Sequence, residues 1–198
     1  VVEALRKNRF EAYYAKDRES ARSLLLNIIP EEYKTIGVGG SVTIRELNIL
    51  ELLADRGHIL LDHGVVQDPE EKLCIRRQQL TSDCFLCGIN AITLDGQIYN
   101  VDGTGNRIAA ITFGPKKVIM VAGINKVTKD LAAARDRLAM IAGPMNSKRI
   151  NANTPCKETG VCSDCQSPER ICNVTHIMHK KPSNTDITVV IVGECLGY

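Results

Sequence analysis

Strand-length apolar runs alternate with helical segments early in the chain, and this alternation limits the possible folds more than any other feature. An apolar run at 33–38 leads into the glycine loop GVGGS, and a helix is predicted from Val42 to Arg56. Residues 58–62 (HILLD) then form a second short apolar run, expected to be a buried strand. A strand, a helix and a strand in this order make a βαβ unit with parallel strands. The chain is therefore predicted to be an α/β protein with a mostly parallel sheet flanked by helices.

Helix signals mark where the other elements begin and end. Asp17 and Glu19 in the first turn and Pro30 at the end predict a helix from Asp17 to Ile29. Thr43 and Glu46 fit a capping box at the start of the next helix. Two further helices are expected at 69–80 and 129–142, and four further strands are expected at 83–89, 108–113, 118–124 and 186–194.

A β-hairpin interrupts this order. Asp95 and Gly96 lie between two β-rich runs in AITLDGQIYNV, and Asp-Gly is a strong signal for a two-residue hairpin turn. The predicted domain is a single unit over 1–198, with this hairpin as an insertion and residues 154–173 as a cysteine-rich loop.

Composition excludes several classes of function. The net charge of +2, the aromatic content of 4% and the absence of Trp argue against nucleic-acid binding. No apolar run reaches the roughly 18 residues that a membrane span needs, and no signal peptide is seen at the N-terminus. A cytoplasmic protein is expected, with residues preceding Val1 because the chain does not begin with Met.

Four of the eight cysteines lie within one polar segment, TPCKETGVCSDCQSPERIC. Cys156, Cys162, Cys165 and Cys172 are spaced C-x5-C-x2-C-x6-C, and four thiolates in one loop can bind zinc or an iron–sulfur cluster. The spacing does not decide between the two, and four free thiols remain the alternative. His176 and His179 follow closely and could replace a ligand, although solvated positions are expected for both.

The other four cysteines are predicted to pack in the core. If DCFLCGI is a strand, Cys84 and Cys87 point to opposite faces and cannot chelate one ion together. Cys74 and Cys195 have no visible partner and receive the same interpretation.

The glycine loop after the first βαβ strand is a candidate anion site. Backbone N–H groups of Gly37, Gly39, Gly40 and Ser41, together with the start of a helix, can hold a phosphate or carboxylate. No Lys follows the last glycine, and Val42 stands where a dinucleotide fingerprint needs its third glycine, so no nucleotide fingerprint is present. A tight turn that needs glycines only for its geometry is the alternative.

A second polar cluster surrounds the hairpin. Asn90, Asn106 and Arg107 have no simple role as turn residues, and with Asp102 they could bind an anionic substrate and transfer protons. Glu194 follows the last predicted strand, where ligands of open α/β sheets bind. Asp102, Arg107 and Glu194 are therefore the candidate catalytic residues.

The longest of these motifs resemble one known family. GVGGSVTIRELN, the run from Asn90 to Lys126, the cysteine loop and VVIVGECLGY are similar to single-domain members of the LUD-domain (lactate-utilization protein) family. The resemblance implies a fold like that of the glucosamine-phosphate isomerase, ribose-5-phosphate isomerase and CoA-transferase superfamily. It also implies a role in oxidising lactate to pyruvate beside separate iron–sulfur partner proteins, and it assigns no catalytic residue.

Three functions are therefore expected in this order. The first is a contribution to the oxidation of lactate-type organic acids, with a small anionic metabolite as ligand and a zinc or iron–sulfur centre in the cysteine loop. The second is an isomerase- or CoA-transferase-like enzyme acting on a phosphorylated or CoA-linked substrate. The third is a non-catalytic assembly or regulatory subunit of an oxidation complex. A homo-oligomer is compatible with all three.

Overall fold

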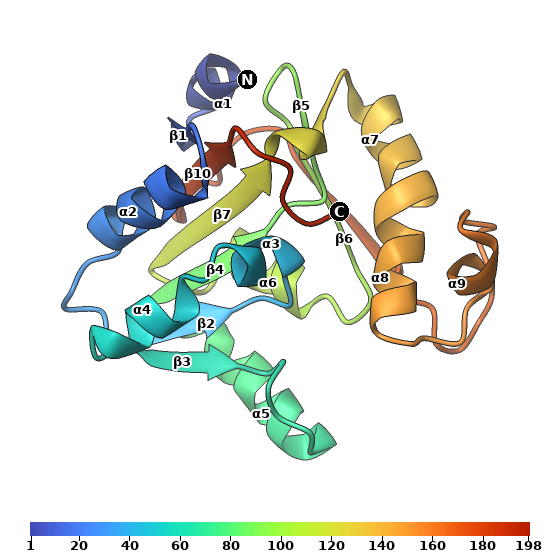
Figure 1. Cartoon of the computed structure of the whole chain (residues 1–198), viewed down its shortest axis with the longest axis horizontal. Coiled ribbons are helices and arrows are strands. Elements are labelled where there is room, and N and C mark those ends of the chain that lie inside the picture. Colours follow the sequence, from blue (N-terminus) through green and yellow to red (C-terminus); the bar gives the residue numbers. More distant parts are fainter.

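The computed structural model describes all 198 residues and contains two β-sheets (Figure 1). The main sheet has six strands in the order β1-β10-β7-β4-β2-β3, and every pairing in it is parallel. Its strands are β1 (Glu11–Ala15), β2 (Thr35–Val38), β3 (Ile59–Asp62), β4 (Cys84–Gly88), β7 (Lys117–Gly123) and β10 (Asp186–Val192). This confirms the predicted α/β class and its parallel sheet.

A second sheet contains the predicted hairpin and is mostly antiparallel. Its order is β8-β5-β6-β9, formed by β5 (Ala91–Thr93), β6 (Ile98–Asp102), β8 (Val127–Thr128) and β9 (Val174–Met178). The hairpin is confirmed, but its loop has three residues, 94–96, and not the two predicted, because Thr93 is hydrogen-bonded to Gln97. Gly96 in this loop has a φ of +81°, a conformation that glycine adopts without strain.

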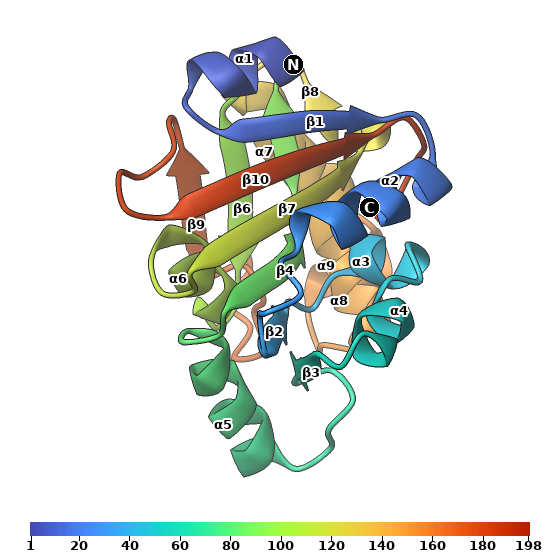
Figure 2. The ribbon, with the colours of Figure 1, turned by 90° about the vertical axis from the view of Figure 1, so that its left-hand side faces the viewer.

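Helices cover both faces of the main sheet (Figures 1 and 2). They are α1 (Val2–Lys7), α2 (Arg18–Ile28), α3 (Val42–Glu46), α4 (Leu50–Asp55), α5 (Pro69–Gln79), α6 (Asn106–Thr112), α7 (Leu131–Arg137), α8 (Gly143–Arg149) and α9 (Pro155–Thr159). Side chains of α2, α3 and α4 pack on one face of the sheet, and those of α1, α6 and the second sheet pack on the other. Helix α7 covers the outer face of the second sheet. No helix in the structure combines the length and the apolar character that crossing a membrane requires.

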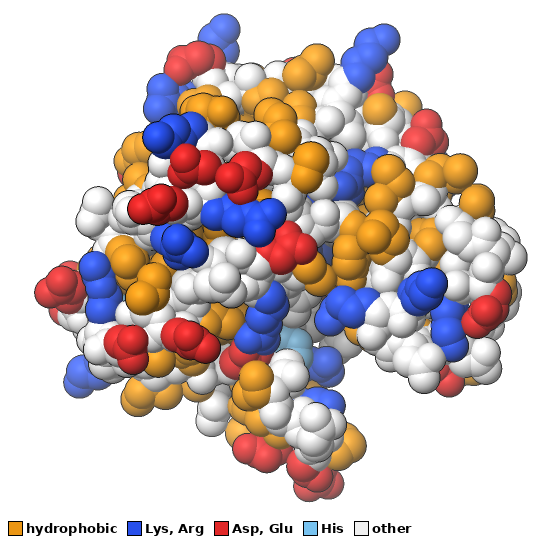
Figure 3. Space-filling model, viewed as in Figure 1, with side chains coloured by type: hydrophobic (Ala, Val, Ile, Leu, Met, Phe, Trp, Pro, Cys, Tyr) orange, Lys and Arg blue, Asp and Glu red, His pale blue; other side chains and the backbone are white.

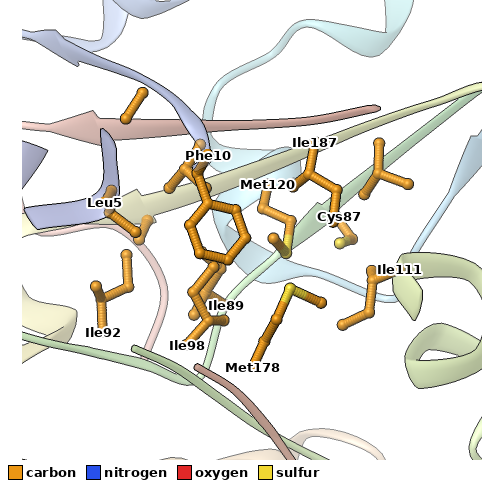
Figure 4. Close-up of a cluster of buried hydrophobic side chains, with 14 of the residues drawn as sticks. Leu5, Phe10, Cys87, Ile89, Ile92, Ile98, Ile111, Met120, Met178 and Ile187 are labelled. Carbon is orange, nitrogen blue, oxygen red and sulfur yellow. The ribbon is translucent and has the colours of Figure 1, made fainter. Parts of the chain in front are cut away.

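The core between the two sheets joins them into one packed unit. Figure 4 shows side chains from both sheets in contact, among them Met120 of the main sheet and Ile98 and Met178 of the second sheet. The predicted separation of Cys84 and Cys87 is confirmed, because Cys87 belongs to this cluster and Cys84 to the cluster on the opposite face. Both thiols are fully buried, and burial raises the pKa of each to about 12.

A π turn (Leu138–Ala142) joins α7 to α8 and changes the hydrogen bonds of that helix. The N–H of Gly143 donates to the carbonyl of Leu138, five residues back, and Pro144 has no N–H. The carbonyl of Ala139 therefore has no partner within the helix, and it accepts from the N–H of Cys162 at 2.9 Å. This bond attaches the cysteine loop to the helix.

Three local predictions were wrong. The helix expected at 42–56 is broken between α3 and α4, where Asn48 has a φ of +50°. Ser41, and not Thr43, caps α3 by accepting from the N–H of Ile44, so the proposed capping box is absent. The strand expected at 108–113 is helix α6, because Ala110 and Ile111 pack one helical face against the core.

Two burial predictions also need correction. Cys74 and Cys195 are exposed and do not pack in the core. The strand β3 is only partly buried, since it forms the edge of the sheet and Ile59 is 61% exposed.

Phe85 should be among the residues on which stability depends most. It is the largest fully buried side chain, and it lies on the central strand β4. We expect Phe85→Ala to reduce the free energy of unfolding by about 3–5 kcal/mol through lost burial and the cavity left behind. Phe113→Ala is the matched control, because Phe113 is 73% exposed. Urea unfolding of both variants checks this, and equal losses would contradict it.

Candidate functional site

A cleft of about 490 Å³ opens where the parallel strands of the main sheet end. The cleft is lined by residues that follow four of these strands: Gly40 and Ser41 after β2, His63 after β3, Asn90 after β4 and Lys126 after β7. Open α/β sheets bind ligands at this edge because loops from adjacent strands meet there. Of the residues that the sequence singled out, Gly40 and Ser41 of the glycine loop and Asn90 lie here.

The opposite wall comes from the helix that carries the π turn. Leu138 and Ala142 of the π turn and Asn146 and Arg149 of α8 line the cleft, and Cys172 of the cysteine loop adjoins them. Figure 3 shows lysine and arginine side chains, with a histidine, around the hollow between the main sheet and this helix. The cleft thus lies between the end of the main sheet and the helix that covers the second sheet.

The charge of the cleft is strongly positive. Its cationic side chains are Lys72, Arg76, Arg107, Lys126 and Arg149. Its one side-chain carboxylate is that of Asp102, which already forms a salt bridge with Arg107 at 2.7 Å. The other four cations form no salt bridge within the protein. A concave surface of one sign raises the local concentration of ligands of the opposite sign, so the cleft suits an anion.

Arg107 has a mainly structural role. Its guanidinium donates to the carboxylate of Asp102, the side-chain oxygen of Asn90 and the carbonyls of Gly88 and Val101, at 2.7–3.1 Å. These groups lie at the ends of β4 and β6, so one side chain connects the two sheets. The second oxygen of Asp102 accepts from the N–H of Ile108 at 2.9 Å and thereby anchors α6.

Arg137 makes a similar connection on the other side of Asn90. It is buried, and it donates to the carbonyl of Asn90 at 2.7 Å and to the carbonyl of Asn125 at 3.1 Å. Asn125 in turn receives the N–H of Leu196 on its side-chain oxygen. The backbone just before Lys126 is therefore held by a hydrogen bond from Arg137.

His63 presents one ring nitrogen to the cleft. The Nε2 amide of Gln79 lies 3.0 Å from its Nδ1 and also donates to the carbonyls of Val38 and Leu61 at 2.9 and 2.8 Å. An amide nitrogen cannot accept a hydrogen bond, so the proton of the neutral ring belongs on Nε2. A Cβ placed on Gly40 would lie 3.7 Å from that Nε2. Burial and the nearby Arg76 hold the pKa of His63 below its ordinary value, which favours the neutral ring, a form that can donate a hydrogen bond.

The glycines of the loop divide into two groups. Gly37 and Gly39 do not line the cleft; a Cβ on either would lie 2.8 Å from Phe85 or Cys87, so close packing requires glycine at both. Gly40 and Ser41 do line the cleft. Gly37 and Gly39 therefore fit the alternative interpretation, in which the loop needs glycine only for its geometry.

The other candidate residues lie in different places. Asn106 lines the cleft with Asp102 and Arg107. Glu194 does not line it, and its carboxylate forms a salt bridge with Arg18 at 2.8 Å. A catalytic role for Glu194 would need this salt bridge to open.

The cysteine loop is not arranged as a ready metal centre. Cys162 and Cys165 lie near enough to add to the effect of burial in raising the pKa of Cys172. The N–H of Asp164 donates to Sγ of Cys162 at 3.4 Å. However, no three His, Cys, Asp or Glu side chains of the chain converge as metal ligands. The residue types suit zinc or an iron–sulfur cluster, but their positions do not fit one, so no chemistry is assigned to a metal here.

Neither nearby histidine is poised to complete such a centre. His176 lies in β9 with its Nε2 3.2 Å from the hydroxyl of Thr112, and His179 is hydrogen-bonded to Gln97. The metal or cluster at Cys156, Cys162, Cys165 and Cys172 stays a prediction.

Sequence reasoning missed five of the residues that line the cleft: His63, Lys72, Arg76, Lys126 and Arg149. His63 and Lys126 follow strands β3 and β7, so the rule that ligands bind beyond the carboxyl ends of strands would have found both. The other three lie on α5 and α8, and no local motif marks them.

Comparisons with known proteins agree with this architecture. The model of the LUD domain matches residues 1–192. The crystal structure of a DUF162-family protein from Deinococcus radiodurans is similar over 96% of this chain and 93% of that chain, with a TM-score of 0.56 and 11% identity. Ribose 5-phosphate isomerase from Plasmodium falciparum shows a partial likeness, covering 57% of this chain and 52% of that chain, with a TM-score of 0.37 and 13% identity. No curated protein matches the chain.

The two arginines of the cleft should differ sharply in their effect on stability. Arg107→Leu leaves the buried carboxylate of Asp102 without its cation, so we expect a loss of about 3–5 kcal/mol in the free energy of unfolding. Arg149→Leu should change it by less than about 0.5 kcal/mol, because Arg149 is exposed and unpaired with any carboxylate. Chemical denaturation measures both, and a tolerated Arg107→Leu would disprove the structural role.

The cysteine loop is tested by its metal content. The sequence predicts that protein purified without oxygen carries zinc or iron, and that replacing all four loop cysteines by Ser removes it. Elemental analysis and visible absorption measure this. Metal-free wild-type protein would show that the four thiols are free, and metal retained by the variant would place it elsewhere.

Proposed function

The chain belongs to the LUD-domain family, and on that premise we propose that it binds a lactate-type organic acid in the cationic cleft and contributes to its oxidation. The observation that carries the proposal is the set of four cations in the cleft that have no carboxylate partner. Unpaired cations that repel one another are costly to hold together, and an anionic ligand removes that cost.

The groups in the cleft suit a 2-hydroxy or 2-oxo acid. Lysine and arginine side chains bind the carboxylate, and the hydroxyl of Ser41 and the Nε2–H of His63 are available to the neighbouring oxygen. Conversion of lactate to pyruvate releases two electrons and two protons. We assign the electrons to a separate iron–sulfur oxidoreductase, and the role of this chain to holding the acid.

A second candidate is favoured by the size of the cleft. A volume of about 490 Å³ and four unpaired cations exceed what a three-carbon acid with one negative charge requires. A phosphorylated or CoA-linked substrate would fill more of this space and use more of the cations.

Binding measurements separate the two candidates. We expect L-lactate and pyruvate to bind in titration calorimetry, more weakly as salt is raised. The variant Lys72→Gln/Arg76→Gln/Arg149→Gln should lose about tenfold or more in affinity, since charge-assisted hydrogen bonds contribute about 1.5–3 kcal/mol each. Lys7→Gln/Lys129→Gln/Arg135→Gln is the control, because it removes the same charge from exposed positions outside the cleft.

Two results would count against the leading proposal. If ribose 5-phosphate or CoA binds and neither lactate nor pyruvate does, the second candidate replaces it. If both triple variants bind the acids as the wild type does, the acid site lies outside the cleft.

A further inference from the structure

Lys126 is a buried lysine without a carboxylate partner. It lies in a short 3-10 turn (Ile124–Lys126) after β7, is only 4% exposed, and lines the cleft. Buried lysines are normally paired with an acidic group, because removing an ammonium from water is costly. Lys126 forms no salt bridge in the structure, so no carboxylate side chain of the protein neutralises its buried charge.

The ammonium group has one hydrogen-bond partner. Its Nζ donates to the hydroxyl of Thr43 at 2.7 Å, and that hydroxyl donates onward to the carbonyl of Leu196 at 3.3 Å. A Cβ on Gly197 would lie 3.3 Å from Nζ, so the backbone of the C-terminal segment closes one side. A lysine ammonium has three donors, and two of them have no acceptor in the protein.

Titratable groups on four elements face Lys126. Arg137 of α7 and Arg107 of α6 repel the ammonium, and Glu46 of α3 favours it. The thiol of Cys87 on β4, whose pKa is raised to about 12, is uncharged near pH 7. The carboxylate of Glu46 is used elsewhere, because it accepts the N–H of Gly197 at 2.8 Å. Burial, followed by the two arginines, lowers the pKa of Lys126 to about 7.

We propose that Lys126 binds the oxyanion of the ligand in the cleft, and that binding is accompanied by proton uptake at this lysine. The oxyanion supplies the missing acceptors and the missing negative charge together. The inference rests on the proposed function in one respect: the proposed function identifies the oxyanion as a carboxylate. A phosphate would be bound by the same chemistry.

Proton uptake gives the inference a distinct pH dependence. An amine with a pKa of about 7 is half protonated at pH 7, so binding to its charged form takes up about half a proton there. The affinity should fall about fivefold between pH 7 and pH 8 as the protonated fraction falls. Burial and Arg76 lower the pKa of His63, which reduces its contribution to this change.

Titration calorimetry of the full chain tests the proposal with three probes: L-lactate, pyruvate and inorganic phosphate. Repeating each titration in buffers of different ionisation enthalpy gives the number of protons taken up. We expect Lys126→Met to lose about 10- to 100-fold in affinity and all of the proton uptake that the protein contributes; phosphate also exchanges protons of its own near pH 7, which lactate and pyruvate do not. Lys129→Met, three residues away and exposed, should behave as the wild type.

The stability of the free protein provides a second readout. Replacing an unpaired buried charge by an apolar side chain of similar length should stabilise the fold, so we expect Lys126→Met to raise the Tm at pH 7 by at least about 2 °C. The difference should shrink between pH 7 and pH 10, because over that range the unfolded lysine, with an ordinary pKa of 10.5, still holds its proton while the folded one has lost it, so raising the pH favours the folded wild type. A lower Tm for Lys126→Met would mean that the lysine serves the fold and would overturn the proposal.

Thr43→Val gives a variant that keeps the amine. Loss of the hydroxyl acceptor should lower the pKa of Lys126 further, and the pH at which affinity falls should decrease with it. An unchanged pH profile in this variant would contradict the assignment of the proton to Lys126.

The outcomes separate this inference from the proposed function. Binding of lactate or pyruvate that survives Lys126→Met leaves the proposed function standing and overturns the inference. Binding of phosphate alone, with proton uptake that Lys126→Met abolishes, supports the inference and overturns the lactate proposal. Failure of the wild type to bind any of the three probes overturns both.

Discussion

The guanidinium of Arg107 is the interaction on which the cleft depends most. It binds the ends of β4 and β6 through four groups, including the carbonyls of Gly88 and Val101, and so fixes the second sheet against the first. Arg137 repeats this on the far side of Asn90. Carbonyls at the ends of strands have no partner within their sheet, and these two arginines supply the missing donors.

The positive charge of the cleft comes from other residues. Arg107 is balanced by Asp102 and Arg137 does not line the cleft, so the charge is that of Lys72, Arg76, Lys126 and Arg149. Lys126 is the most buried of the cationic side chains that line the cleft. Binding sites often hold like charges close together, which lowers the stability of the protein when no ligand is bound.

Much of the fold followed from local patterns in the sequence. The βαβ order, the Asp95-Gly96 hairpin and the opposite orientation of Cys84 and Cys87 all depend on neighbours within a few residues, and all are confirmed. The failures depend on tertiary contacts. The segment 108–113 has a strand-like composition, but Asp102 accepts the N–H of Ile108 near its first turn and the core receives one helical face.

The site divides in the same way. Gly40, Ser41, Asn90 and Asn106 line the cleft as the motifs suggested, while the cations of α5 and α8 could not be placed without the packing of those helices. The compact cysteine motif was informative about residue type only. Whether four thiols converge depends on the course of the loop, which the π turn helps to fix through the bond from Cys162 to Ala139.

A crystal structure of the chain soaked with pyruvate tests the central claim most directly. The account predicts carboxylate density in the cleft, with an oxygen about 3 Å from Nζ of Lys126, the distance of a charge-assisted hydrogen bond. Pyruvate bound at another surface, with the lysine still donating only to Thr43, would contradict it.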